Sequence, residues 1–358
     1  MSTARRHMVE PRRRSGKVRD TRVTLSHGSG GKAMRDLIDD VFVDCFDNPV
    51  LAPLEDQARF SLAELTAHGD RLAFTTDSYV VDPLFFPGGD IGRLAVAGTV
   101  NDLVVGGARP LSLSCAVIIE EGLEIDLLRR VARSMRATAD EAGVSLVTGD
   151  TKVVHRGAAD KLFVNTAGLG VIPAGREIGA HRARPGDAIL INGRIGEHGA
   201  AILEARGDLA LDTDVDSDCQ PLGGLVEALL AACPDVHCLR DATRGGLATV
   251  LNEFAQASGC CLRIEEGSVP VRDEVRGICE ILGLDPLYLG NEGRIVAVVP
   301  AAGADLALDA MRAHPAGRDA VCIGEVRDAP AGLVLLGTLF GGDRILDMLV
   351  GEQLPRIC

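Results

Sequence analysis

The chain ends on a cysteine, Cys358, directly after the residues Pro-Arg-Ile. A thiol on a free end can enter two active sites in turn, so a partner enzyme could modify this sulfur before its own fold receives it. The residues beyond Gly342, extended at ~3.3 Å each, could span about 50 Å. We therefore expect a mobile tail, 342–358, that alternates between an inward and an outward position. The spacing of apolar residues over 344–349 is helical, which favours partial docking of this tail.

Three acidic clusters in the first half of the chain have the residue types of a metal and nucleotide site. They are Thr75-Thr76-Asp77, Asn101-Asp102 and Gly149-Asp150-Thr151-Lys152. Mg²⁺ commonly binds one or two carboxylates together with phosphate oxygens. Any one cluster alone is also typical of a turn or a helix cap. Asp102 is harder to explain in that way, because it lies among apolar positions of an expected helix, where an unpaired carboxylate is costly to bury.

Lysines accompany these acids. Lys152 follows the third cluster and Lys161 opens the next expected strand, so both could face a phosphate as compact charges. The glycine loop that ends at Lys32 does not fit the P-loop pattern, which requires glycine and a hydroxyl where Ser26 and Ala33 stand. A Walker-type NTPase is therefore disfavoured, and no dinucleotide fingerprint stands in a strand-turn-helix context.

The second half of the chain adds further polar motifs. The stretch 240–247 places Asp241 and donor side chains before an expected helix, whose first amides favour anions. Glu292 lies between Asn291 and Gly293 beside an expected strand, and the stretch 196–199 (Gly-Glu-His-Gly) is typical of a turn. Each motif alone indicates a turn, but together with the first-half acids they favour a phosphate pocket.

Strands and helices alternate in two blocks, which predicts an α+β fold of two domains. We expect a disordered basic extension (1–22), an N-terminal ligand-binding domain (23–173), a C-terminal α/β domain (174–341) and the tail. The expected strands are 71–76, 111–119, 145–154, 161–171, 187–191, one into 241, 262–265, 295–299, 320–326 and 333–336. The expected helices follow the glycine loop and Asp90 and then cover 125–142, 225–233, a stretch from 246, 271–282 and 304–314.

Composition restricts the class of protein. The 358 residues are 46% hydrophobic and 25% charged, which is typical of a folded chain with a sizeable core. The net charge of -14 argues against a general nucleic-acid surface, because phosphate binding relies on Lys and Arg. No apolar stretch approaches the roughly 18 residues of a membrane span. Ten cysteines without a recognisable signal peptide favour free thiols in the cytoplasm.

Several strings resemble the HypE family of hydrogenase maturation proteins. They are Thr-Thr-Asp-Ser-Tyr-Val-Val-Asp-Pro-Leu-Phe-Phe-Pro-Gly-Gly-Asp from Thr75, Gly-Thr-Val-Asn-Asp-Leu from Gly98, Val-Thr-Gly-Asp-Thr-Lys-Val-Val from Val147, Arg-Asp-Ala-Thr-Arg-Gly-Gly from Arg240, and the terminal Pro-Arg-Ile-Cys. The resemblance runs from about His27 to Cys358. The acidic strings are typical of a wider ATP-using group with aminoimidazole ribonucleotide synthetase, thiamine-monophosphate kinase and selenophosphate synthetase, whereas the Pro-Arg-Ile-Cys end is specific to HypE.

The resemblance implies an aminoimidazole ribonucleotide synthetase-like fold and a homodimer whose first domains pair through their strands. It also implies a reaction sequence. HypF carbamoylates the Cys358 thiol, the chain dehydrates that group to a thiocyanate with ATP and Mg²⁺, and a HypC–HypD complex accepts the cyano group for the iron of nickel-iron hydrogenase.

The resemblance also suggests roles for the motif residues. Glu292 and Lys152 lie nearest the role of proton acceptor, although Lys152 could instead stabilise charge. Metal and nucleotide contacts are expected from Asp77, Asn101, Asp102, Asp150, Lys161 and Asp241, with the four aspartates on the metal.

Two alternatives remain open at this point. A related phosphotransferase such as a selenophosphate synthetase would be expected to carry a reactive cysteine near the glycine loop before Lys32, where none stands. A non-catalytic metal carrier would need more ligands than the lone thiol of Cys358. ATP hydrolysis that appears only after carbamoylation would favour the dehydratase, and metal uptake without nucleotide would favour the carrier.

Overall fold

The computed structural model describes residues 17–207, 213–351, 354 and 356–358. The expected basic extension lies outside the described residues over 1–16, as does Pro355 of the terminal motif. The expectation of disorder through residue 22 is wrong at its end. Arg22 forms an ion pair of 2.8 Å with Glu124, and the amide of Ile125 donates to the carbonyl of Thr21, so the chain is anchored before residue 23.

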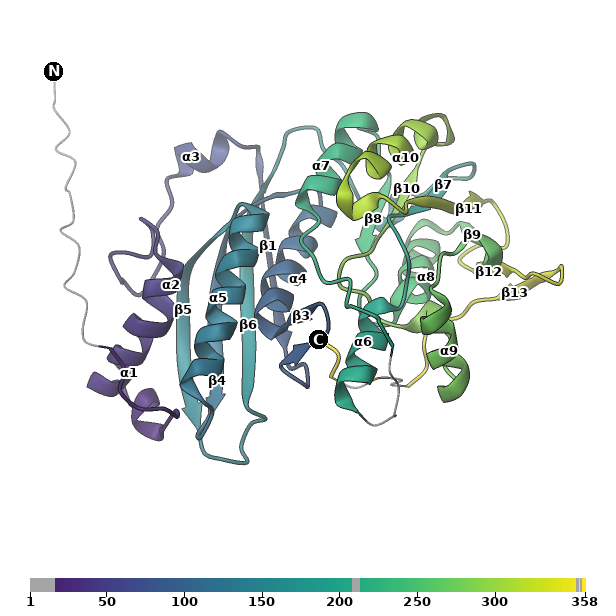
Figure 1. Ribbon diagram of the computed structural model, residues 1–358. Coiled ribbons are helices and arrows are strands. Elements are labelled where there is room, and N and C mark those ends of the chain that lie inside the picture. The colour runs from purple at the N-terminus through teal and green to yellow at the C-terminus, as the bar shows by residue number, and fades with distance from the viewer. Residues whose placement is uncertain (1–16, 208–212, 352–353, 355) are drawn as a thin grey trace, which may run out of the picture.

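The first sheet has four strands in the order β1-β6-β4-β5 (Figure 1). The strands are β1 (Arg71–Tyr79), β4 (Arg109–Glu120), β5 (Ser145–Val154) and β6 (Leu162–Ile172), with α4 (Ile91–Val105) and α5 (Ile125–Ala142) against one face. Asp90 caps α4 as expected, because its carboxylate accepts from the amides of Gly92 and Arg93. α5 ends at Gly143, whose φ of 69° suits glycine.

The opposite face of this sheet carries exposed apolar side chains. Leu72 and Phe74 of β1 are 59% and 73% exposed, and Ile118 of β4 is 43% exposed. Their strand neighbours Ala73, Thr75 and Val117 point to the helix-covered face, because side chains alternate along a strand. A sheet normally buries its apolar face against another layer, so this open face is incomplete in one chain.

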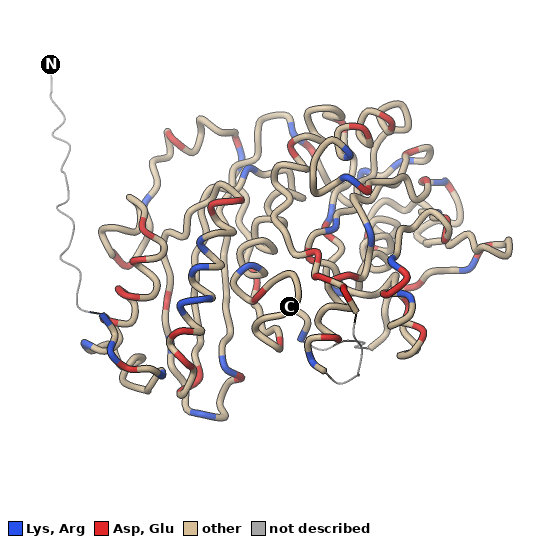
Figure 2. Tube along the Cα trace, in the orientation of Figure 1, with Lys and Arg blue, Asp and Glu red and all other residues tan. Residues whose placement is uncertain are grey.

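Short elements precede and connect these strands. They are η1 (Leu25–Gly28), α1 (Lys32–Leu37), η2 (Ile38–Val43), α2 (Asp44–Phe46), α3 (Leu62–Thr66), β2 (Phe85–Phe86) and β3 (Gly89–Asp90). Basic residues along α5, blue in Figure 2, hold the first helices in place. Arg129 binds the carboxylate of Asp40 at 2.7 Å, and Arg136 donates to the carbonyl of Cys45 at 3.3 Å. The N-terminal helices are thereby fixed beside the β5 edge.

The second sheet has seven strands in the order β13-β12-β9-β11-β7-β10-β8. They are β7 (Ala188–Ile191), β8 (Cys238–Asp241), β9 (Cys261–Glu265), β10 (Ile295–Val299), β11 (Val321–Arg327), β12 (Val334–Gly337) and β13 (Asp343–Ile345). The accompanying helices are α6 (Glu197–Arg206), α7 (Gly223–Ala232), α8 (Gly246–Ser258), α9 (Asp273–Leu282) and α10 (Ala304–Ala313), with short 3₁₀ turns η3 (Ala180–Arg182), η4 (Glu266–Ser268), η5 (Pro286–Tyr288), η6 (Ala301–Gly303) and η7 (Pro315–Gly317).

One hydrophobic cluster joins the two halves. It contains Leu94 and Val104 of α4, Leu225 of α7, Val299 of β10, and also Cys358. Burying these residues together removes apolar surface of both halves from water. The end of the tail is thus part of the core in this structure.

Two expectations for the second half are wrong. The tail is not helical over 344–349. β13 pairs antiparallel with β12 over 343–345, and residues 346–349 form neither helix nor strand, although Leu346 is fully buried. The stretch 196–199 is not an isolated turn but the start of α6, because Gly196 at φ 81° turns the chain into the helix.

The ten cysteines are free thiols, of which Cys322 alone is classed as exposed. Among the described helices, none combines the length and the apolar character that crossing a bilayer requires.

Two glycines allow a stability test of this packing. A Cβ on Gly149 of β5 would lie 2.2 Å from the carbonyl oxygen of Cys115, whereas a Cβ on Gly277 of α9 would meet nothing within 4 Å. We expect Gly149→Ala to lower the free energy of unfolding by about 1–3 kcal/mol. Gly277→Ala should raise it by about 0.5–1 kcal/mol. Urea unfolding measures both, and equal effects would contradict the strand geometry.

Candidate functional site

The last residues of the tail dock beside the end of β1. The amide of Val80 donates to the carbonyl of Cys358 at 3.1 Å, and the amide of Asp82 donates to the carbonyl of Arg356 at 3.3 Å. The guanidinium of Arg356 returns a hydrogen bond of 3.1 Å to the carbonyl of Val80. The tail is therefore held by backbone hydrogen bonds against the chain that leaves β1, and Cys358 is only 9% exposed.

The Cys358 thiol lies against a cation and an acid. Arg244, in the loop before α8, donates to its sulfur at 2.9 Å. Burial, followed by the charge of Glu292, raises the pKa of the Cys358 thiol to about 12, although Arg244 opposes the shift. The sulfur is therefore a neutral thiol at physiological pH, and this pocket favours an uncharged group on the tail.

Glu292 belongs to a buried loop before β10 and is 4% exposed. The carboxylate of Asp218 accepts from the amide of Glu292 and from the amide of Gly293, each at 3.1 Å. Burial, and then the charges of Asp218 and Asp241, raise the pKa of Glu292 well above its usual value. A carboxylate with a raised pKa is a stronger base than an ordinary glutamate.

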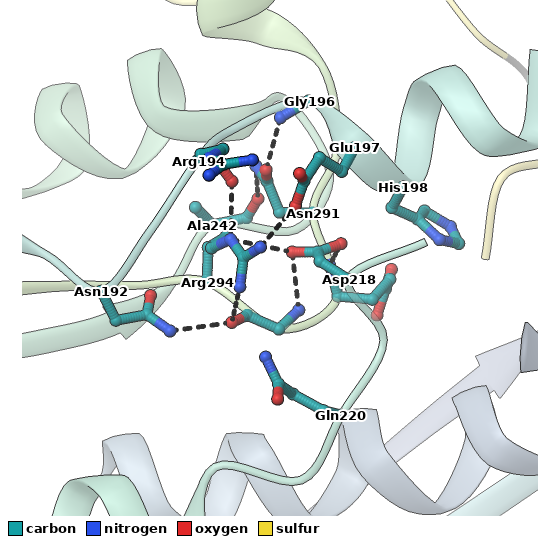
Figure 3. Close-up of polar contacts among 12 residues, drawn as sticks. Asn192, Arg194, Gly196, Glu197, His198, Asp218, Gln220, Ala242, Asn291 and Arg294 are labelled. Atoms are coloured by element: carbon teal, nitrogen blue, oxygen red, sulfur yellow. Dashed lines mark hydrogen bonds and ion pairs between the residues drawn. The ribbon is translucent and has the colours of Figure 1, made fainter. Parts of the chain in front are cut away.

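Arg294 supplies the positive charge that this loop needs (Figure 3). Its guanidinium binds the carboxylate of Glu197 and lies 3.5 Å from the carboxylate of Asp218. It also donates to the carbonyl of Arg194 at 2.6 Å. Asn291 completes the loop, because its side-chain oxygen accepts from the amide of Gly196 at 2.8 Å. Paired charges of this kind can remain buried, whereas either acid alone would be costly.

Three of the expected metal ligands interact electrostatically. The hydroxyl of Thr75 donates to Asp102 at 2.9 Å. Burial raises the pKa of Asp102, and the charge of Asp77 adds to that effect. Burial and the charge of Asp102 raise the pKa of Asp241 to about 7. Carboxylates that repel one another in this way fit a cation bound among them.

These acids do not form a complete metal cage. Within the described ranges no group of three or more His, Cys, Asp or Glu side chains is arranged to hold a metal ion. Mg²⁺ commonly takes only one or two carboxylates and completes its shell with water and phosphate oxygens. Asp77, Asp102 and Asp241 therefore fit a Mg²⁺ that arrives with a phosphate ligand.

Asn101 has a different environment from that of the neighbouring acids. It is 1% exposed, and its amide nitrogen donates to the carbonyls of Gln220 and Glu292 at 3.0 and 3.3 Å. Its side-chain oxygen accepts from the amide of Leu222 at 2.8 Å. Backbone groups of Gln220, Leu222 and Glu292 thus occupy this amide, and the expected nucleotide contact of Asn101 stays a prediction.

Asp150 and Lys152 lie apart from these residues. β5 and β1 are opposite edges of the first sheet, three strand spacings or roughly 14 Å apart. The two acids also lie on different faces of the sheet. Asp77 pairs with Thr166 on the helix-covered face. Asp150 pairs with Ala116, which pairs in turn with Asn165, and these three residues lie on the open face. The expected convergence of all four aspartates does not occur within one chain. Asp150 instead binds Lys152 at 2.8 Å, and both are about half exposed.

A cavity of about 680 Å³ lies at the β5 edge. Gly30 and Gly31 of the glycine loop line it together with Ile38, Phe42 and Asp150. Its walls combine apolar side chains and glycine backbone with one arginine and four acids, Arg35, Asp39, Glu55, Asp56 and Asp150. Such a lining suits a ligand with an aromatic and a polar part. The glycine loop therefore borders a cavity, although it lacks the P-loop pattern.

Lys161 lies neither among the three aspartates nor in the cavity at the β5 edge. It has a φ of 65°, and its ammonium binds Asp82 at 3.0 Å. Because the amide of Asp82 holds the carbonyl of Arg356, Lys161 lies next to the docked tail rather than in the cavity.

Sequence reasoning missed the residues that hold the site together. Asp218 and Arg294 stand in no recognisable motif, and their roles follow only from the three-dimensional contacts. Arg244 and Glu197 do belong to glycine-flanked motifs, which is the one signal that could have marked them. His198 follows Glu197 in α6 and hydrogen-bonds the tail, although its motif indicated only a turn.

Known proteins match nearly the whole chain. The family models described as AIR synthase related protein match residues 55–172 (N-terminal domain) and 184–335 (C-terminal domain). Carbamoyl dehydratase HypE of Rhodobacter capsulatus is 61% identical over 341 residues, which cover 95% of this chain and 99% of that protein. Its counterpart in Escherichia coli (strain K12) is 53% identical over 336 residues, which cover 94% and 99%.

Solved structures agree with these matches. A structure of hydrogenase maturation protein HypE in complex with ATP has a TM-score of 0.88 at 52% identity and covers 93% of this chain and 99% of that chain. A HypE–HypF complex has a TM-score of 0.76 at 46% identity, covering 87% and 99%. Thiamine monophosphate kinase from Aquifex aeolicus, at 18% identity and a TM-score of 0.58 over 78% and 89%, shows the same fold alone. The two-part α+β fold expected from the sequence is confirmed.

The repulsion among the acids leads to a test by substitution. We expect Asp241→Asn to raise the melting temperature of the metal-free protein by about 2 °C or more, because it removes a buried like charge. Mg²⁺ with ATP should then stabilise the variant less than the parent chain. Asp309→Asn, at an exposed position of α10, serves as a control with little expected change. A lower melting temperature for Asp241→Asn would contradict the repulsion.

Proposed function

This chain belongs to the HypE family of carbamoyl dehydratases, and from that membership we propose that it dehydrates an S-carbamoyl group on its own Cys358 to a thiocyanate with ATP. The observation that carries the proposal is the docked tail, with the Cys358 sulfur 2.9 Å from Arg244 and under the charge of the buried Glu292. The terminal residue is thereby held as a substrate would be, inside the fold that would act on it.

The chemistry needs a leaving group on oxygen and a base for nitrogen. The carboxamide oxygen attacks the γ-phosphorus of ATP, and ADP leaves. Nitrogen then loses two protons in all while the carbon–oxygen bond breaks, so phosphate carries the oxygen away and a carbon–nitrogen triple bond remains. Glu292 is our candidate for the proton acceptor, and the Arg244 guanidinium faces the group on sulfur and can stabilise charge that develops there.

Asp77, Asp102 and Asp241 would hold Mg²⁺, which neutralises phosphate charge during the transfer. The cavity at the β5 edge is our candidate for nucleotide binding, since a HypE relative is known in complex with ATP. This cavity and the docked tail lie at opposite edges of the sheet. A nucleotide in the cavity is therefore badly placed for the tail of the same chain.

A homodimer through the open face of the first sheet would resolve this separation. Leu72, Phe74 and Ile118 on that face need an apolar cover, and a second copy offers the same surface in return. Asp150 and Lys152 lie on the same face, so Lys152 reaches a reaction centre only through such pairing. We therefore assign Lys152 to the interface between copies, as proton acceptor or charge stabiliser.

The proposed partners follow from the two tail states. Because the inward Cys358 is a neutral thiol, it is a poor nucleophile there, and loading with a carbamoyl group requires the tail to leave the pocket. A HypE relative is known in a complex with HypF, which we propose as the loading enzyme. The cyano group would then pass to a HypC–HypD complex for the iron of nickel-iron hydrogenase.

Mass spectrometry of the C-terminal peptide tests the reaction. After incubation with HypF, carbamoyl phosphate and ATP, we expect a carbamoyl adduct on Cys358 that then loses one water. Glu292→Gln should keep the first step and slow the second by about 10²- to 10⁴-fold. Since the pKa of Glu292 is raised, its base form grows as pH rises, and the single-turnover rate should rise with pH. The exposed Glu280→Gln is the matched control, and dehydration at full rate in Glu292→Gln would refute this assignment.

Size-exclusion chromatography with light scattering tests the dimer. Phe74→Glu places a charge on the open face, so we expect it to yield monomers with little loss of stability, because the side chain is 73% exposed within one chain. Leu306→Glu on α10, a site 61% exposed, should leave the oligomer unchanged. A monomeric parent chain at micromolar concentration would rule out the proposed pairing.

A further inference from the structure

His198 links α6 to the docked tail. It is fully buried, and its Nε2 lies 2.6 Å from the carbonyl oxygen of Ile357, the residue directly before the terminal cysteine. Its Nδ1 lies 2.8 Å from the hydroxyl of Ser217, and the edge of the ring meets Phe86 at 5.5 Å between centroids. Figure 3 shows His198 beside Glu197 and near Asp218 of the loop network.

The hydrogen-bond partners define the protonation of this ring. A carbonyl oxygen only accepts, so Nε2 must carry the proton and donate to Ile357. The Ser217 hydroxyl accepts from the amide of Cys219 at 3.1 Å and can donate its own proton to Nδ1. Burial lowers the pKa of His198, in agreement with a neutral ring. The side chain is thus held in one tautomer with its donor aimed at the tail.

The same helix contacts the tail again at its other end. Arg206, the last residue of α6, donates to the carbonyl of Arg356 at 3.0 Å and to the carbonyl of Asp82 at 3.0 Å. Two carbonyls in succession, those of Arg356 and Ile357, are therefore bound by side chains of one helix. The Ile357 side chain is 5% exposed and approaches Gly290, where a Cβ would lie 2.5 Å from its Cδ1.

We propose that His198 is a positioning residue that latches the inward tail through the Ile357 carbonyl, with Arg206 as a second point of attachment. The latch grips backbone carbonyls and leaves the sulfur free, so it can hold Cys358 in the same place whether or not a group is attached. The inference rests on the proposed function in taking the tail as the carrier of the substrate. The latch is present in the chain without nucleotide and without a group on Cys358, and it can be measured there.

Alkylation of the full-length protein by iodoacetamide, followed peptide by peptide with mass spectrometry, measures the latch. The Cys358 thiol reacts only from the released tail, so its rate reports how often the latch opens. We expect His198→Leu, which removes the donor, to raise this rate about five- to tenfold. His198→Gln, whose amide can still donate from a similar position, should stay within about twofold of the parent.

Two other cysteines serve as internal controls. Cys322 is exposed and should react equally in all variants, and the fully buried Cys238 should stay protected unless the fold opens. An unchanged Cys358 rate in His198→Leu would overturn the latch. If Cys238 also reacts in that variant, the fold has opened, and Arg206→Met becomes the test of the latch. An unchanged Cys358 rate in Arg206→Met would then overturn the proposal. No turnover is required, so a failed latch leaves the proposed dehydration untouched, and a failed dehydration leaves the latch measurable.

Discussion

The buried carboxylate of Asp218 sets the arrangement at the boundary of the two sheets. A charge in that position requires compensation, which comes from Arg294 and from the amides of Glu292 and Gly293. These contacts fix the backbone of the loop before β10 at Glu292, whose charge acts on the Cys358 thiol. Asn101 of α4 braces the same loop from the first half of the chain. The position of Glu292 thus depends on contacts from both halves of the chain.

The pocket around Cys358 combines burial with few compensating cations. Arg244 is the cation that the structure places on the sulfur, and it does not outweigh burial and Glu292. An uncharged sulfur substituent, such as a thiocarbamate, meets no such penalty. The pocket therefore favours a tail that carries an uncharged group on sulfur over a tail that ends in a thiolate. In the proposed reaction, loading would take place outside the pocket and dehydration inside it.

Much of the fold could be predicted from the sequence, because its elements have regular periodicity and clear ends. The helix over 125–142 has a continuous apolar face and stops at Gly143, and the structure places it at the same residues. The tail could not be predicted in this way. The spacing over 344–349 fits a helix, but residues 343–345 instead form backbone hydrogen bonds with the edge of β12. Local spacing carries no information about such an edge.

The candidate site could be predicted only in part. Asp77, Asp102 and Asp241 influence one another electrostatically, as does Glu292 the Cys358 thiol, while their roles in metal binding and catalysis stay predictions. Asp150 and Lys152 do not join them, because strand order and side-chain alternation are properties of the sheet rather than of any motif. A motif shows which residue types are present, whereas the strand register determines the face of the sheet on which their side chains lie.

Docking of the last residue has a consequence for storage of the enzyme. Oxidants such as peroxide attack the thiolate rather than the thiol. With its pKa near 12 and only 9% of its surface in contact with water, Cys358 is chemically quiet while docked. The exposed Cys322 would meet an oxidant first. The resting fold thereby keeps its terminal sulfur reduced between rounds of use.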